Sequence, residues 1–172
     1  SSCDSFDFSV SFIKKAGLIL LQDSIEKALK RGVQGRLLTS TYQNFTDIPS
    51  LEAFLHWQEL YPNFKCRLEY DSFGDEGFHT KGYLFNFKDH REVIIGSSNI
   101  TYWALVKNKE WDLSLEISHN DEVYQEIAKE FSFFWDHTSS LNPDIVKQYT
   151  EHLKYAIEQW DMDFFDPNSN EL

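Results

Sequence analysis

The stretch that decides the fold is FHTKGYLF, residues 78–85, near the middle of the chain. Its aromatic residues are typical of a β-strand, which we expect to extend over residues 79–87. Because residues two apart on a strand point to the same face, the imidazole of His79 and the ammonium of Lys81 would project side by side. An unpaired charge is costly to bury, so this pair indicates a place where an anion binds.

A second polar motif follows the next strand, which we expect at residues 92–95. GSSN, residues 96–99, reads as a tight turn in which glycine permits close backbone approach, and Ser97 and Asn99 supply hydrogen-bond donors. Glu110 lies eleven positions beyond Asn99, at the entry of a strand expected over residues 111–117. Taken singly, these are an ordinary turn and a solvated carboxylate, and only their combination with the His79 motif indicates a site.

On the N-terminal side of this region, strands and helices alternate, and helices follow it on the C-terminal side. We expect further strands at residues 6–12, 33–39 and 64–70, a loop at 71–77, and helices at 14–31 and 49–60. Thr46 or Asp47 would cap the second helix. Two more helices are expected after Asn120 and near Pro143, the first with Val123, Ile127, Phe131 and Phe134 or Trp135 on its apolar side. This order predicts an α/β fold in which helices sandwich a mixed β-sheet.

The length of 172 residues suits roughly one domain, which we place at residues 1–166. Residues 167–172 read as a disordered tail or the start of a linker. Because the chain begins with Ser1 rather than Met, we expect it to be a piece of a longer protein or to carry the remnant of a tag.

The formal net charge is −12, which argues against a broad surface that binds nucleic acid without specificity. It leaves room for a small cationic cleft in an acidic shell. The two cysteines, Cys3 and Cys66, have no Cys or His at metal-ligand spacing, so neither a disulfide framework nor a zinc site is expected, and a cytoplasmic location is the default. No apolar run is long enough to span a bilayer. The other five histidines have no suggestive neighbours in the sequence, which also shows no clustered set of metal ligands.

The order and spacing of His79-x-Lys81, Gly96-Ser97-x-Asn99 and Glu110 resemble the active-site signature of the phospholipase D superfamily, in particular its short single-motif nucleases. Three further segments, residues 11–13 (SFI), 37–42 (LLTSTY) and 78–81 (FHTK), resemble the nuclease domain at the N-terminus of some bacterial helicases. The resemblance runs from about residue 8 to residue 135. It implies the phospholipase D/nuclease-like fold and a downstream helicase in the parent protein.

The resemblance also implies a mechanism. A single-motif chain forms a homodimer with one shared active site, in which His79 of one subunit attacks phosphorus and His79 of the other protonates the leaving oxygen. Lys81, Asn99 and Ser97 would hold the phosphoryl oxygens, and Glu110 would accept a hydrogen bond from a His79 ring. Neither a metal nor another cofactor is needed. The substrate would be nucleic acid, with DNA favoured over RNA.

One position departs from the family motif, which has Asp five residues after the lysine. Here that residue is Asn86, so a catalytically degenerate module that binds nucleic acid and dimerises stays open as the alternative. A lipid phosphodiesterase is disfavoured because the chain is short and acidic and has no basic amphipathic helix to bind a membrane.

Overall fold

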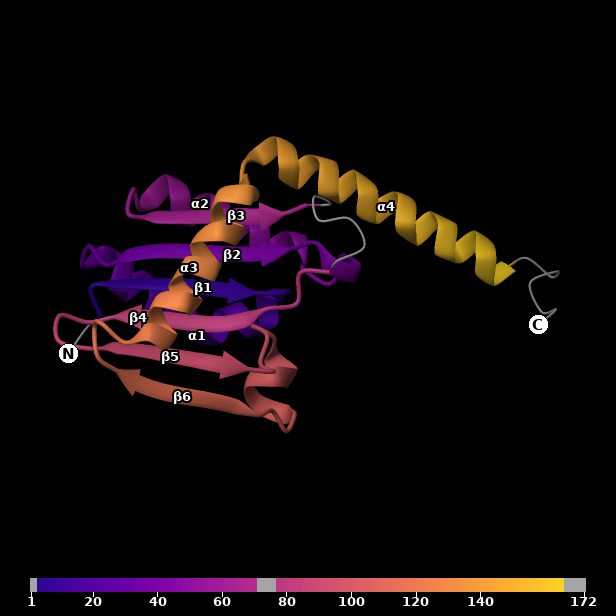
Figure 1. The fold of residues 1–172 in the computed structure, drawn as a ribbon. Coiled ribbons are helices and arrows are strands. Elements are labelled where there is room, and N and C mark those ends of the chain that lie inside the picture. Colours follow the sequence, from indigo (N-terminus) through magenta and orange to yellow (C-terminus); the bar gives the residue numbers. More distant parts are fainter. Residues whose placement is uncertain (1–2, 71–76, 166–172) are drawn as a thin grey trace.

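The computed structural model describes residues 3–70 and 77–165, with side chains up to residue 156 (Figure 1). Its centre is a seven-stranded sheet of order β6-β5-β4-β1-β2-β3-β7. Three neighbouring strands run parallel: β1 (Ser5–Val10), β2 (Gln34–Ser40) and β3 (Phe64–Glu69). On the other side of β1 the sheet continues antiparallel with β4 (Lys81–Asn86), β5 (Arg91–Gly96) and β6 (Asp112–Ile117), and the short β7 (Ser139–Ser140) pairs with β3.

Helices cover both faces of this sheet, as Figure 1 shows. α1 (Lys15–Lys30) and α2 (Ile48–Leu60) lie on one face, and α3 (Glu122–His137) crosses the other. α4 (Pro143–Phe165) packs its first turns on the α1/α2 side and then extends past the sheet. The predicted α/β class, a mixed sheet sandwiched by helices, is confirmed.

Alternation along β1 shows why the sheet has two different faces. Phe6, Phe8 and Val10 are buried in the main core with α1 and α2. Asp7 and Ser9 point to the opposite face, under α3, where a thinner apolar layer includes Leu84. One face of the sheet is therefore a dry core, whereas the other carries buried polar groups.

The start of α2 also fixes the start of α1. Asp47 is the predicted cap, since its Oδ1 accepts the backbone N–H of Ser50 at 3.0 Å. Its Oδ2 accepts the backbone N–H of Lys15 at 2.9 Å, so one carboxylate caps both helices. Thr46 instead donates its hydroxyl to the carbonyl of Ser40 at 2.6 Å and ties the end of β2 to this corner.

Several element bounds differ from the prediction. β4 begins at Lys81 rather than at residue 79, and Gly96 belongs to β5. The chain bends at Ser97 and continues irregularly through residues 98–99, instead of forming a tight turn. The apolar side of α3 is wrong at one position: Val123 is exposed, and Tyr124 is buried in its place. Asp121 caps the helix through the N–H groups of Val123 and Tyr124, so both residues lie in its first turn. There the side chain of Tyr124, rather than that of Val123, is turned inward.

Three elements were not predicted: the 3-10 helix η1 (Tyr42–Asn44), the π-helix η2 (Trp103–Lys107) and β7. The expected loop at residues 71–77 falls largely outside the described residues, as does the whole tail after residue 166. The expected domain limits therefore stay a prediction.

The register brings several strand ends to one edge of the sheet. Val10, at the carboxyl end of β1, pairs with Lys81, at the amino end of β4. Gly96, at the carboxyl end of β5, pairs with Asp112, at the amino end of β6. Because β2 and β3 run parallel to β1, their carboxyl ends reach the same edge, which is where the predicted site residues lie.

Candidate active site

His79 lies just before β4 and is exposed, whereas Lys81 has only 8% of its surface exposed. The Lys81 Nζ donates a hydrogen bond to the backbone carbonyl of His79 at 3.0 Å, so its ammonium folds back toward the histidine. The His79 ring meets the ring of Tyr42 edge to face, with centroids 5.7 Å apart. Both residues lie at the sheet edge, but His79 is outside the strand and the ammonium bonds to its carbonyl rather than to its ring. The side-by-side projection of imidazole and ammonium stays a prediction.

Hydrogen bonds to β1 fix the segment that carries His79. The backbone N–H of Ser11 donates to the carbonyl of Thr80 at 2.8 Å, and the Ser11 hydroxyl donates to the carbonyl of Phe78 at 2.9 Å. The hydroxyls of Ser9 and Thr80 lie 2.6 Å apart on the α3 face. His79 is therefore held on both sides along the backbone while its ring stays accessible.

Burial lowers the pKa of Lys81, since removing an ammonium from water disfavours its charged form. The negative charge of Glu110 acts in the opposite direction and favours the ammonium. A cation held partly out of water attracts an anion more strongly than a solvated one does. The site thus holds a partly buried cation, Lys81, in a chain of net charge −12.

Ser97 and Glu110 are in direct contact, which was not predicted from the sequence. The Ser97 hydroxyl donates to Glu110 Oε2 and accepts the backbone N–H of Trp111 at 3.1 Å. The side-chain amide of Asn108 donates to Glu110 Oε1 at 3.2 Å. Within the described chain, these hydrogen bonds of Glu110 go to Ser97 and Asn108 rather than to a histidine, so the role of Glu110 toward His79 stays a prediction.

Asn99 is buried at the same edge. Its Oδ1 accepts the backbone N–H of Phe12 at 3.2 Å, which orients the amide. Since the oxygen is used in this bond, the NH₂ group is the part of the side chain that can donate to a phosphoryl oxygen.

Gly96 is required by close packing. A Cβ at this position would lie 2.2 Å from the carbonyl oxygen of Trp111 and 2.0 Å from Oδ1 of Asp112. Asp112 accepts hydrogen bonds from both the backbone N–H and the hydroxyl of Ser98. The segment that carries Ser97 and Asn99 is thus clamped against the start of β6.

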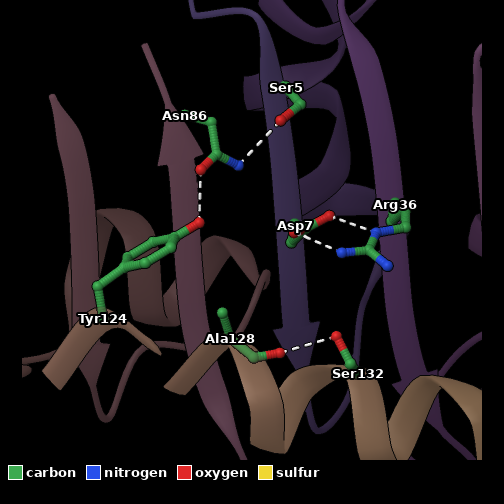
Figure 2. Close-up of polar contacts among 7 residues, drawn as sticks. All are labelled: Ser5, Asp7, Arg36, Asn86, Tyr124, Ala128 and Ser132. Atoms are coloured by element: carbon green, nitrogen blue, oxygen red, sulfur yellow. Dashed lines mark hydrogen bonds and ion pairs between the residues drawn. The ribbon is translucent and has the colours of Figure 1, made fainter. Parts of the chain in front are cut away.

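Asn86, the residue that departs from the family motif, lies at the opposite end of β4 from Lys81. Its Nδ2 donates to the hydroxyl of Ser5 at 2.9 Å, and the hydroxyl of Tyr124 donates to its Oδ1 at 2.5 Å (Figure 2). Asn86 therefore ties β1, β4 and α3 together and is remote from His79.

An ion pair lies beside this link under α3 (Figure 2). Arg36 Nε and Nη2 donate to the two carboxylate oxygens of Asp7 at 2.6 and 2.8 Å. The hydrogen bond to Asp7 raises the pKa of Arg36, and the guanidinium lies 4.8 Å from the ring centre of Phe131. These groups are bonded to one another and hold α3 in place.

The sequence reasoning missed Tyr42, Ser11, Asn108 and Asp112. Asn108 could have been found, because it precedes Glu110 by two positions, a spacing that puts both side chains on one side of an extended chain. Tyr42 and Ser11 carry no such signal, since only the folded chain brings them to His79.

A cluster of possible metal ligands lies at the far edge of the sheet, contrary to the expectation that none exists and that His90 has no suggestive neighbours. Ligand atoms of His90, Glu92 and Glu116 all lie within 4.8 Å of one another. The hydrogen bond from His90 Nδ1 to Asp89, 2.9 Å long, raises the pKa of His90. This cluster could not be predicted from the sequence, because Glu116 is brought next to Glu92 only by the pairing of β5 with β6. It is separate from the His79 site.

Comparison with known proteins was made on sequence and on structure. The family described as "Cardiolipin synthase, PLD-like domain" matches residues 1–135. No curated protein matches in sequence. Within residues 3–70 and 77–165, no helix combines the length and the apolar character that crossing a membrane requires.

Three solved structures share the fold at low identity. NucT from Helicobacter pylori has a TM-score of 0.58 and 17% identity, covering 79% of this chain and 81% of its own. Nuc from Salmonella typhimurium, titled a phospholipase D family member, has a TM-score of 0.59 and 16% identity, covering 81% and 83%. Phosphatidylserine synthase from Haemophilus influenzae Rd KW20 has a TM-score of 0.59 and 15% identity, covering 92% of this chain and 40% of its own.

The family that matches residues 1–135 agrees with the resemblance of the His79, Gly96 and Glu110 motifs, and the fold is consistent with both. This chain belongs to the phospholipase D-like domain family.

Proposed function

We propose that this domain hydrolyses nucleic-acid phosphodiester bonds without a metal ion, as a nuclease. The observation that carries the proposal is the exposed His79 ring beside the buried Lys81 ammonium, with Asn99 and the Ser97–Glu110 pair along the same sheet edge. A phosphodiester is anionic, so its hydrolysis needs positive charge, a nucleophile and an acid for the leaving group. One chain supplies the charge and the nucleophile.

The acid would come from a second copy. In the first step a ring nitrogen of one His79 forms a bond to phosphorus, and the P–O bond to the leaving oxygen breaks as the partner subunit's His79 gives that oxygen a proton. In the second step the same partner histidine takes a proton from water, whose oxygen attacks phosphorus and breaks the P–N bond. Lys81 and Asn99 would hold the phosphoryl oxygens throughout.

Exposed apolar side chains on the two segments that flank Glu110 in the chain support the homodimer. Trp103 and Val106 of η2 are 65% and 50% exposed, and Trp111 and Leu113 at the start of β6 are 90% and 61% exposed. Glu110 lies between these two groups in the chain. Large apolar side chains rarely gather on the surface of a monomer unless they bind a partner. A second copy seated here would bring the two His79 residues toward one phosphate.

The resemblance to helicase-linked nucleases supports a DNA substrate and a helicase downstream in the parent protein. The titles of two structural relatives, NucT and Nuc, are consistent with a nuclease. A basic partner domain would also supply the phosphate contacts for which a chain of net charge −12 has few cations.

The test is hydrolysis of bis-p-nitrophenyl phosphate in excess EDTA. We expect turnover to persist in the chelator and to be abolished in His79→Ala, since lysines rather than a metal supply the positive charge. Activity that disappears in EDTA and returns with Mg²⁺ would refute the metal-independent mechanism.

The alternative is a catalytically degenerate module that binds nucleic acid and dimerises. The substitution of Asn86 for the motif Asp favours it, although Asn86 bonds to Ser5 and Tyr124 at the far end of β4. A dimer that binds an oligonucleotide but hydrolyses neither it nor the nitrophenyl ester would establish this alternative.

A further inference from the structure

A cleft opens beside the candidate active site, between α3 and the sheet. Its volume is about 270 Å³, and His79 and Lys81 both line it. Its floor is formed by β4 and β5, including Gly82 and Ile95. If the phosphate of a substrate lies at His79, the part of the substrate attached to that phosphate would lie at the mouth of this cleft.

The lining of the cleft suits a flat, largely apolar ring with polar edges. Ile95, Ile127 and Phe134 supply apolar walls. The exposed carboxylate of Glu130 stands on α3 among them, and the Ser9–Thr80 hydroxyl pair lies at the inner side. The volume is close to the lower limit for small-molecule pockets, so a single ring system fits and a pair of acyl chains does not.

The charge of the chain points to the same kind of ligand. A protein that binds a polynucleotide through its backbone needs many phosphate contacts from Lys and Arg. With a net charge of −12, this domain must obtain much of its substrate affinity elsewhere. Stacking and burial of a base provide affinity that needs no cations.

The geometry points to a nucleobase site: the cleft binds the base adjacent to the scissile phosphate, and the substrate is single-stranded or has an unpaired nucleotide. This inference rests on the proposed nuclease function and specifies its substrate. A base stacked and paired within a duplex cannot enter the cleft. Glu130 would accept hydrogen bonds from an exocyclic amino group, which favours cytosine, adenine or guanine over thymine or uracil.

The experiment uses dinucleoside phosphates, which contain one scissile bond each. We compare deoxycytidylyl-deoxycytidine with two analogues in which one or the other base is replaced by an abasic tetrahydrofuran. Removing the base that occupies the cleft should lower kcat/KM roughly 5- to 100-fold, and removing the other should have a smaller effect. Thymine at the sensitive position should be cleaved more slowly than cytosine.

Gly82→Val provides a variant that fills the cleft. A Cβ at Gly82 would meet only Leu84 Cδ1, at 3.9 Å, so the first added carbon fits without a clash, and the two methyl groups of valine would extend from it toward the cleft. We expect this variant to lose the preference for the intact dinucleotide over the abasic one. The matched control is Ser114→Val, at an exposed strand position outside the cleft, which should keep the full preference.

The outcomes separate this inference from the function on which it rests. Equal cleavage of all the dinucleotides by the wild-type chain would overturn the base site while leaving the nuclease intact, even if Gly82→Val failed to fold. No hydrolysis of any dinucleotide or of the nitrophenyl ester would overturn the proposed function itself. Release of headgroups from phosphatidylglycerol vesicles, with the dinucleotides left intact, would overturn both in favour of a lipid substrate.

Discussion

Lys81 is subject to two opposing requirements, because burial disfavours its positive charge whereas anion binding needs that charge. It is buried, with its ammonium directed to the His79 carbonyl, and its burial lowers its pKa. Burying a charge with one neutral hydrogen-bond partner costs stability. The same burial strengthens its attraction for a phosphate. Under the proposed function, Lys81 therefore favours anion binding at a cost to the stability of the fold.

Lys81→Met should therefore abolish hydrolysis and stabilise the domain by about 1 kcal/mol at neutral pH. Because the folded pKa is lowered, the folded chain releases this proton at a pH where the unfolded chain still holds it, so wild-type stability rises with pH toward about 10. The advantage of the Met variant should shrink over that range. Urea unfolding at several pH values measures it, and a variant less stable than the wild type at pH 7 would contradict the reasoning.

Asn86→Asp restores the family motif but should change activity by no more than about threefold, because the residue is remote from His79. Tyr124 can still donate to the carboxylate, and the hydroxyl of Ser5 can turn to donate as well, so we expect a stability change within about 1 kcal/mol. Hydrolysis of the nitrophenyl ester and urea unfolding check the two statements. An increase in rate of tenfold or more would mean that Asn86 limits catalysis.

At the scale of elements, the site depends on how β5 passes into the segment after Gly96. That segment packs so closely on the start of β6 that no side chain fits at Gly96. This close packing positions Ser97 against Glu110. The chain then continues to Asn99, which is buried. Two antiparallel strands thus fix three site residues.

Gly96→Ala should force the two strands apart and destabilise the domain by roughly 1–3 kcal/mol. Activity should fall further than stability does, since Ser97 and Asn99 move with the strand end. Ser114→Ala is the control on β6, at an exposed strand position outside the cleft. Thermal unfolding and kcat on the nitrophenyl ester measure both variants. Equal behaviour of the two would show that the close packing at Gly96 does not position the site.

The elements could be predicted from the sequence where local pattern decides. Phe6, Phe8 and Val10 alternate with polar residues, and the structure places β1 there. The exclusion of His79 from β4 and the formation of η2 depend on tertiary contacts. The close approach of Gly17 to the backbone of Thr101, just before η2, is one such contact, and no periodicity encodes it.

The candidate site was predictable in part for the same reason. His79, Lys81, Ser97, Asn99 and Glu110 were found by their order and spacing, and the sheet register brings all of them to one edge. The partners that orient them could not be found. Tyr42 reaches His79 from a distant segment, and nothing in the sequence distinguishes it from the other tyrosines.

At the scale of the whole molecule, the acidic chain exposes four large apolar side chains on the two segments that flank Glu110: Trp103, Val106, Trp111 and Leu113. A single chain offers one His79, whereas the proposed reaction needs a nucleophile and an acid at the same time. Catalysis would then belong to the dimer rather than to either chain.

The measurement that tests this claim most directly is the activity of purified mixed dimers, in which one wild-type chain is paired with one His79→Ala chain carrying a different affinity tag. A mixed dimer of wild type and Ser114→Val, tagged in the same way, is the control and should keep full activity. If both histidines serve one phosphate, the His79→Ala mixed dimer should be almost inactive on the nitrophenyl ester. A rate of about half that of the wild-type dimer would show that each His79 works in its own site, and would contradict the shared active site.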